Sequence, residues 1–239
     1  MKILLFGGSG KLGKQIALLA KKNKKIKIYT PTHSQCDITD YKTLRKYVLK
    51  INPDIIINSA GLVGLKECEK DKCKAYEVNF KGAYYVGNVC DEFHIRLIYI
   101  STAVLFDGKK GMYKETDKIH PVSHYAYTKA LGEQSSLLVT NALSIRLDFF
   151  PLTGLKYKTI FTDHYTSKIP VNIAGRLILK ASLNHNIKGV LNIGQHRDTL
   201  FNLLKPYYPD ILPIKIKESS MPKFPKDISL DLTNMNRLL

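Results

Sequence analysis

A tyrosine and a lysine one helical turn apart are the residues of this chain best placed to do chemistry. Tyr125 and Lys129 are separated by three residues in a segment that reads as a helix, so both side chains face the same way. An ammonium held near a phenol favours the phenolate and lowers a pKa that otherwise lies near 10. Proton transfer to or from a substrate oxygen would then be possible near neutral pH. In a lysine-rich chain the same spacing also arises on ordinary helix surfaces, so the interpretation needs a second motif.

The second motif is a glycine turn at the start of the chain. An apolar run at residues 3–6 leads directly into glycines, and a helix is expected to begin near Lys11. Gly7 permits a tight turn, Gly10 allows backbone N–H groups to approach a pyrophosphate, and Gly13 lets the helix pack closely on the strand. The spacing is G-x-x-G-x-x-G, which is typical of short-chain dehydrogenases and reductases. The turn therefore predicts a dinucleotide site.

Strand-like and helical runs alternate along the chain, which predicts an α/β fold with a doubly wound, Rossmann-like parallel sheet. Right-handed crossovers would bring Gly7, Gly61 and Thr102 to the carboxyl edge of that sheet. We expect a dinucleotide-binding domain over residues 1–150, with 170–194 returning to it, and a small substrate lobe over 151–239. Strands are expected at 3–6, 26–29, 54–60, 95–101, 143–147 and 189–193, and helices at 11–22, 41–51, 73–93, 125–140 and 171–183.

Composition narrows the class of protein. The net charge is +17, but the only dense basic run, residues 21–27, has no interleaved aromatic residues, so we expect no nucleic-acid partner. The positive field would instead attract a dinucleotide and a nucleotide-linked substrate. The four cysteines lack metal-ligand spacing, so no metal site is expected. No signal peptide or membrane span is recognisable, and we expect a cytoplasmic protein without a membrane partner.

Further segments resemble one family, the extended short-chain reductases of the dTDP-4-dehydrorhamnose reductase type. The resemblance covers nearly the whole chain and includes a proline- and lysine-containing tail that leads to Ser229-Leu230-Asp231. Its other segments are residues 36–40, 53–61, 78–79, 100–108, 113–117 and 129–133.

The resemblance implies a role for each matching residue. Tyr125 would be the general acid, Lys129 would tune it and hold the nicotinamide ribose, and Thr102 would orient the substrate carbonyl. Asp37 could instead be a residue of the N-cap region, just before the start of a helix. The cofactor is expected to be NADP or NAD; we favour NADPH, although residues 29–33 contain neither a carboxylate nor an arginine that would decide. Cofactor contacts are expected from Gly7, Gly10, Lys11, Leu12 and Gly13 at the pyrophosphate, Asp37 and Ile38 at the adenine, and Ala60, Gly61 and Leu62 towards the nicotinamide, besides Tyr125 and Lys129.

Two departures from the family affect the substrate. Ala103 and Val104 occupy the places of an Asp-Tyr pair, and Asp148-Phe149-Phe150 replaces a Thr-Ser-Trp-like run. Thr102, Ala103 and Phe149 are the expected substrate contacts.

The expected activity is NAD(P)H-dependent reduction of a nucleotide-linked 4-keto-6-deoxy sugar, by an enzyme that could form a homodimer through its helices at 73–93 and 125–140. Two alternatives stay open: a nucleotide-sugar 4-epimerase on the same scaffold, and a non-catalytic NAD(P)-binding subunit such as the regulatory β subunit of methionine adenosyltransferase.

Overall fold

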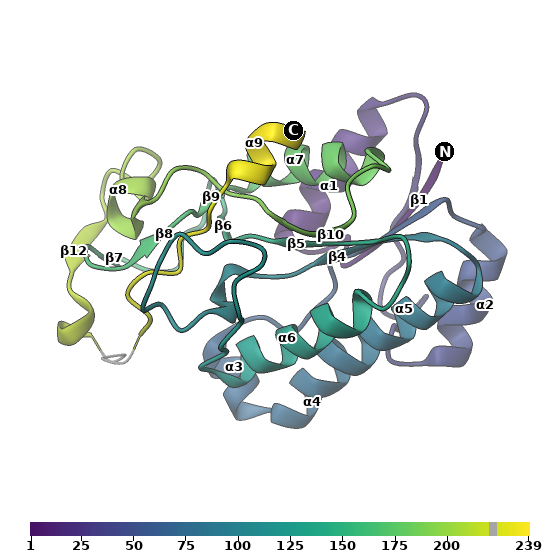
Figure 1. Cartoon of the computed structure of the whole chain (residues 1–239), viewed down its shortest axis with the longest axis horizontal. Coiled ribbons are helices and arrows are strands. Elements are labelled where there is room, and N and C mark those ends of the chain that lie inside the picture. The colour runs from purple at the N-terminus through teal and green to yellow at the C-terminus, as the bar shows by residue number, and fades with distance from the viewer. Residues whose placement is uncertain (220–223) are drawn as a thin grey trace.

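A six-stranded parallel sheet forms the centre of the protein (Figure 1). The computed structural model of the chain describes residues 1–219 and 224–239. The strand order is β10-β5-β4-β3-β1-β2. β3, β4 and β5 are buried along their whole length, as expected for strands covered on both faces. The strands are β1 (Lys2–Phe6), β2 (Lys27–Tyr29), β3 (Ile55–Asn58), β4 (Arg96–Ile100), β5 (Ala142–Arg146) and β10 (Gly189–Asn192).

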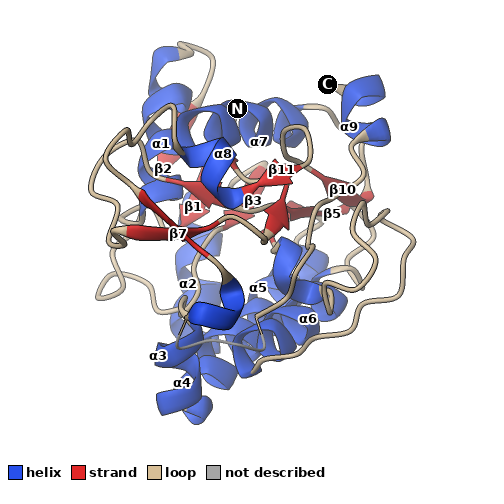
Figure 2. Ribbon diagram, turned by 90° about the vertical axis from the view of Figure 1, so that its left-hand side faces the viewer, coloured by secondary structure: helices blue, strands red, loops and turns tan. Residues whose placement is uncertain are grey.

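Helices cover both faces of this sheet, which confirms the predicted doubly wound α/β fold (Figures 1 and 2). One face carries α1 (Lys11–Lys22) and α7 (Val171–Leu183), whose Ile16 and Ala174 belong to one apolar core cluster. The other face carries α2 (Tyr41–Ile51), α5 (Gly82–Glu92) and α6 (His124–Ser136). None of the described helices combines the length and apolar character that crossing a bilayer requires.

The helix predicted over residues 73–93 is interrupted. It comprises α4 (Lys72–Tyr76), a π-helical turn at Glu77–Lys81 and then α5, and a short unpredicted helix, α3 (Leu65–Lys70), precedes it. A π turn inserts a residue into the helical ladder and is frequent at functional sites. Asn79 is the middle residue of this turn and is buried.

Three short pairs of strands, short helices and loops lie outside the main sheet. α7 and β10 do return to the sheet from the second half of the chain, whereas the proposed boundary at residue 150 stays a prediction. The other elements are β6 (Phe149–Phe150) with β9 (Ile169–Pro170), β7 (Thr159–Phe161) with β12 (Leu212–Ile214), β8 (Tyr165–Thr166) with β11 (Asp198–Thr199), α8 (Leu200–Leu204) and α9 (Thr233–Leu238), together with 3₁₀ turns at Ala103–Leu105 and Ile216–Glu218.

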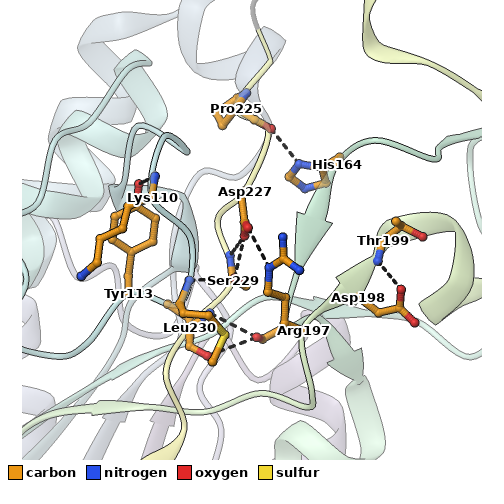
Figure 3. Close-up of polar contacts among 12 residues, drawn as sticks. Lys110, Tyr113, His164, Arg197, Asp198, Thr199, Pro225, Asp227, Ser229 and Leu230 are labelled. Carbon is orange, nitrogen blue, oxygen red and sulfur yellow. Dashed lines mark hydrogen bonds and ion pairs between the residues drawn. The ribbon is translucent and has the colours of Figure 1, made fainter.

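The C-terminal segment, defined here as residues 224–231, joins this outer part to the loop after β4 (Figure 3). Pro222, which belongs to the tail motif, lies outside the described residues. The backbone N–H of Asp227 donates to the carbonyl of Gly108 at 3.1 Å. The Asp227 carboxylate accepts from Arg197 Nε at 2.8 Å and from Ser229 Oγ at 2.6 Å. These contacts hold the segment against both the loop after β4 and the residues that lead into β11.

Candidate active site

The glycine turn lies where β1 is flanked by β2 on one side and β3 on the other, which is the topological switch point of such a sheet. Gly7 has φ 78°, and a Cβ there would come within 2.5 Å of the Ser59 carbonyl oxygen. A Cβ on Gly13 would lie 2.2 Å from the Gly7 carbonyl oxygen. Both glycines are therefore required by the fold itself. At Gly10, by contrast, a Cβ would meet only the Gly7 carbonyl oxygen, at 3.3 Å, and the space beyond it is open.

The first turn of α1 faces this opening and suits an anion. Gly10 is its N-cap and provides no side-chain hydrogen bond, and the first turn contains no acidic residue. Backbone N–H groups at a helix start carry partial positive charge and bind phosphate well. Lys11 is exposed beside them, whereas Leu12 is buried and offers a ligand only its backbone. The glycine turn and α1 thus fit the pyrophosphate of a dinucleotide.

Tyr125 and Thr102 come together at the same edge of the sheet. Ser123 caps α6 by accepting a hydrogen bond from Ala126 N at 3.2 Å, which places Tyr125 in the first turn. The Thr102 side chain lies close enough to the Tyr125 phenol to lower its pKa through hydrogen bonding. Thr102 is buried, and its Oγ1 also accepts from Val104 N at 3.3 Å, which begins the 3₁₀ turn. Two hydroxyl groups therefore adjoin, as stabilisation of an alkoxide would require.

Lys129 lies one turn further along α6 and is buried beneath this pair. Its Nζ donates to the carbonyl of Ile100 at 2.6 Å and lies 4.1 Å from the centroid of the Tyr99 ring. Burial lowers the pKa of Lys129 to about 7, although the nearby Glu133 carboxylate acts in the opposite direction. The amine therefore changes charge close to neutral pH.

The expectation that the pKa of Tyr125 is lowered is wrong. The pKa of Tyr125 is raised rather than lowered, first because the phenol is buried and second because the Asp148 carboxylate is near. The hydrogen bond with Thr102 opposes this change. Lys129 does not counteract it, since its amine is directed at a backbone carbonyl and its own pKa is low. Tyr125 is consequently protonated at neutral pH, the form that a general acid needs.

Asn79 connects the loop after β3 to α6, a role that the sequence reasoning did not assign. Its Oδ1 accepts from Leu62 N at 2.8 Å, and its Nδ2 donates to the Leu62 carbonyl at 3.0 Å and to Thr128 Oγ1 at 3.1 Å. Residues 60–62, which are expected to contact the cofactor, are thereby held beside the helix that carries Tyr125. The sequence signals were the family resemblance at residues 78–79 and a polar residue among apolar neighbours.

Asp37 is occupied by its own turn. Its Oδ1 accepts from Thr39 N and Thr39 Oγ1, both at 2.8 Å, while its Oδ2 lies 3.2 Å from His33 Nε2. Asp40 is the N-cap of α2, so Asp37 lies just before the cap and does not itself cap the helix. The Ile38 side chain is buried in the core. The adenine contacts of both residues stay a prediction.

The residues predicted to contact the substrate differ in their accessibility. Ala103 is buried in a cluster that includes Phe106 and Leu230, so its side chain offers a ligand no surface. Phe149 is half-buried on β6. The residue before it, Asp148, forms an ion pair with Lys168 at 3.2 Å, and neither was predicted as a site residue.

The parallel sheet, the glycine turn and the Tyr125/Lys129 pair define an extended short-chain dehydrogenase/reductase. The sequence model of the family described as RmlD substrate binding domain matches residues 1–148, and the chain belongs to this family.

Named relatives agree with this assignment. The chain is 34% identical over 140 residues to a dTDP-4-dehydrorhamnose reductase of Aggregatibacter actinomycetemcomitans, a match that covers 58% of this chain and 47% of the relative. It is 32% identical over 145 residues to the spore coat polysaccharide biosynthesis protein SpsK of Bacillus subtilis, covering 60% and 51%. The chain thus spans about half the length of the curated relatives it matches.

Solved structures match over nearly their full lengths. A hypothetical dTDP-4-dehydrorhamnose reductase from Sulfolobus tokodaii is 28% identical with a TM-score of 0.86, covering 100% of this chain and 95% of that one. The reductase of Bacillus anthracis, solved with NADP, is 22% identical with the same TM-score of 0.86, covering 100% and 92%. At 22% identity, the similarity to the Bacillus anthracis structure shows the fold alone.

Proposed function

We propose that this protein is an NAD(P)H-dependent reductase that converts a nucleotide-linked 4-keto-6-deoxy sugar into its 4-hydroxy product. The observation that carries the proposal is the adjoining hydroxyl pair of Thr102 and Tyr125, with Lys129 one helical turn away, at the sheet edge that also bears the glycine turn. The family and its named sugar-nucleotide reductases support the substrate class.

In this proposal the chain holds the reacting oxygen and supplies a proton. Thr102 and Tyr125 bind the C4 oxygen of the sugar, and Tyr125 donates its proton as negative charge develops there. Lys129, whose pKa is about 7, carries part of a positive charge at neutral pH and binds the ribose next to the nicotinamide. The reduced nicotinamide, when bound, supplies the hydride. Gly10 and the first turn of α1 would hold the pyrophosphate, because the backbone leaves room for it there.

NADPH is the favoured cofactor. After β2 the backbone carries the hydroxyl side chains of Thr32 and Ser34, whose oxygens are 3.0 Å apart, and the exposed imidazole of His33. Hydroxyl and imidazole N–H groups can donate hydrogen bonds to the oxygens of a 2′-phosphate. Thermal denaturation with NADPH and with NADH tests this choice, because the tighter ligand raises the melting temperature more at equal concentration.

The activity is tested by adding dTDP-, UDP- and GDP-linked 4-keto-6-deoxy sugars to the purified protein with NADPH. A reductase consumes reduced nicotinamide in proportion to product. An epimerase would interconvert 4-hydroxy sugars with no net loss of reduced nicotinamide, and a binding subunit would bind cofactor and convert nothing. Absence of turnover with all three nucleotides, while cofactor binding is intact, would overturn the reductase proposal.

The same proposal includes a homodimer and a cytoplasmic location. Tyr84 on α5 and Tyr127 on α6 are 41% and 50% exposed, and together with Tyr76 they leave aromatic surface on neighbouring helices. Aromatic residues are common at protein interfaces. Light scattering of wild-type protein and of Tyr84→Glu tests the dimer: a dimeric wild type and a monomeric variant support it, and a monomeric wild type contradicts it.

A further inference from the structure

Asp148, whose charge acts on Tyr125, forms a charged pair with Lys168. The proposed reaction gives this pair no role. The carboxylate of Asp148 is 3.2 Å from Nζ of Lys168, and the two side chains are 24% and 22% exposed. Asp148 lies between β5 and β6, and Lys168 directly precedes β9. The pair is therefore partly shielded from water but still within reach of a ligand.

The pairing of β6 with β9 fixes the positions of Asp148 and Lys168. β6 and β9 run parallel with Phe149 opposite Ile169, and the Ile169 N–H donates to the Asp148 carbonyl at 3.1 Å. This ladder sets Lys168 across from Asp148. The carboxylate consequently projects from ordered backbone, with an ammonium from the adjacent strand to hold it.

The backbone that leads into Asp148 also lies next to the segment that carries Thr102. The Ala103 N–H donates to the Leu147 carbonyl at 3.1 Å, so Asp148 follows directly after the residue that pairs with the Thr102 segment. The charge of Asp148 also contributes to the raised pKa of Tyr125. The carboxylate thus lies near the two hydroxyl groups proposed to bind the C4 oxygen.

Sugar chemistry then limits what this carboxylate can bind. In a 4-keto-6-deoxy hexose, C4 is flanked by C3, which carries a hydroxyl, and by C5, which carries a methyl group and the ring oxygen. The C3 hydroxyl is the only hydrogen-bond donor vicinal to the C4 oxygen, and an ionised carboxylate is an acceptor only. The neighbouring Ala103 and Val104 have no polar side-chain group to take that role.

We infer that Asp148, held in place by Lys168, accepts a hydrogen bond from the C3 hydroxyl of the sugar and selects substrates that carry it. This inference rests on the proposed function. It makes Asp148 a specificity-determining residue and Lys168 a positioning residue. A carboxylate placed one strand away from Thr102 would supply the polar group that the apolar side chains of Ala103 and Val104 do not provide.

The test compares two substrates in wild type and variants, with kcat/KM as the readout. The substrates are the nucleotide-linked 4-keto-6-deoxy sugar that wild type reduces and its 3-deoxy counterpart. Asp148→Asn should lower kcat/KM for the parent sugar by roughly 5- to 10-fold, the difference between a hydrogen bond to a charged and to a neutral acceptor. For the 3-deoxy sugar the variant and wild type should agree within roughly threefold, because neither then makes the bond. Lys168→Met should show the same selectivity with a smaller loss.

Glu92→Gln is the matched control, because it breaks an ion pair with Arg45 at the far end of α5. It should change kcat/KM for neither sugar. Equal losses on both sugars would overturn the inference while leaving the reductase proposal intact. If wild type reduces neither sugar, the proposed function itself fails. Should Asp148→Asn fail to fold, as judged by thermal denaturation, Lys168→Met decides: loss confined to the parent sugar supports the inference, and equal loss on both sugars contradicts it.

Discussion

The side-chain nitrogen of Lys129 lies 4.1 Å from the centroid of the Tyr99 ring, so the lysine of the proposed catalytic pair rests on an aromatic face inside the protein. A ring face attracts a cation, but it replaces only part of the hydration that burial removes. Tyr99 is itself buried. The lysine therefore destabilises the folded protein most strongly when it is protonated.

This arrangement predicts a pH-dependent stability effect of Lys129→Met. The folded-state pKa, about 7, lies below the ordinary 10.5, so between these values the unfolded chain holds one more proton and the cost of burying Lys129 falls as pH rises. Relative to wild type, the variant should gain about 3 kcal/mol more at about pH 6 than at about pH 9. Urea denaturation of both proteins at both pH values measures the difference. A gain that is the same at the two pH values would contradict the lowered pKa.

Gly10→Val should abolish dinucleotide binding while preserving the fold. Gly10 has φ −71°, which any residue adopts, and a Cβ there meets only one carbonyl oxygen, at 3.3 Å. The branched side chain would occupy the space proposed for the pyrophosphate. Isothermal titration with NADPH measures the affinity. Gly87→Ala, where a Cβ finds ordinary contacts at 3.6 Å, is the control and should bind normally. Unchanged affinity in Gly10→Val would exclude the glycine turn as the phosphate site.

Tyr125→Phe should reduce turnover by roughly 10²- to 10⁴-fold, the range for a lost general acid. Cofactor affinity should change little, because the hydroxyl is directed towards Thr102. Single-turnover kinetics with the reduced nicotinamide measure the chemical step. Near wild-type turnover would remove Tyr125 from the mechanism.

Asn79→Asp should weaken both stability and cofactor affinity although the side-chain shape is kept. The carboxylate can still accept from Leu62 N, but it cannot donate to the Leu62 carbonyl or to Thr128. Leaving such buried groups unpaired costs about 1–3 kcal/mol. Denaturant unfolding and NADPH titration measure the two effects. Normal stability together with normal affinity would show that the hydrogen bonds of Asn79 to Leu62 and Thr128 are dispensable.

The parts predicted well from the sequence are those governed by local pattern. Continuous apolar runs identified the strands of the main sheet, and the glycine spacing located the turn before α1. The state of Tyr125 could not be predicted in this way, because its pKa depends on burial and on Asp148, a residue beyond the next strand. Asn79 was missed for a similar reason: its partners Leu62 and Thr128 lie 17 and 49 residues away. Local spacing carries no information about such pairings.

The C-terminal segment and α9, which follows it, also have a consequence for the order of folding. Met112 N donates to Ser229 Oγ across 117 residues of sequence, and Asn234 Nδ2 donates to Glu115 Oε2 across 119. β1, β2 and β3 pair over much shorter separations. Contacts between distant residues carry a larger loop-closure entropy and form late. On a ribosome, the glycine turn would therefore be assembled while the loop at residues 107–117 still lacks its C-terminal partners.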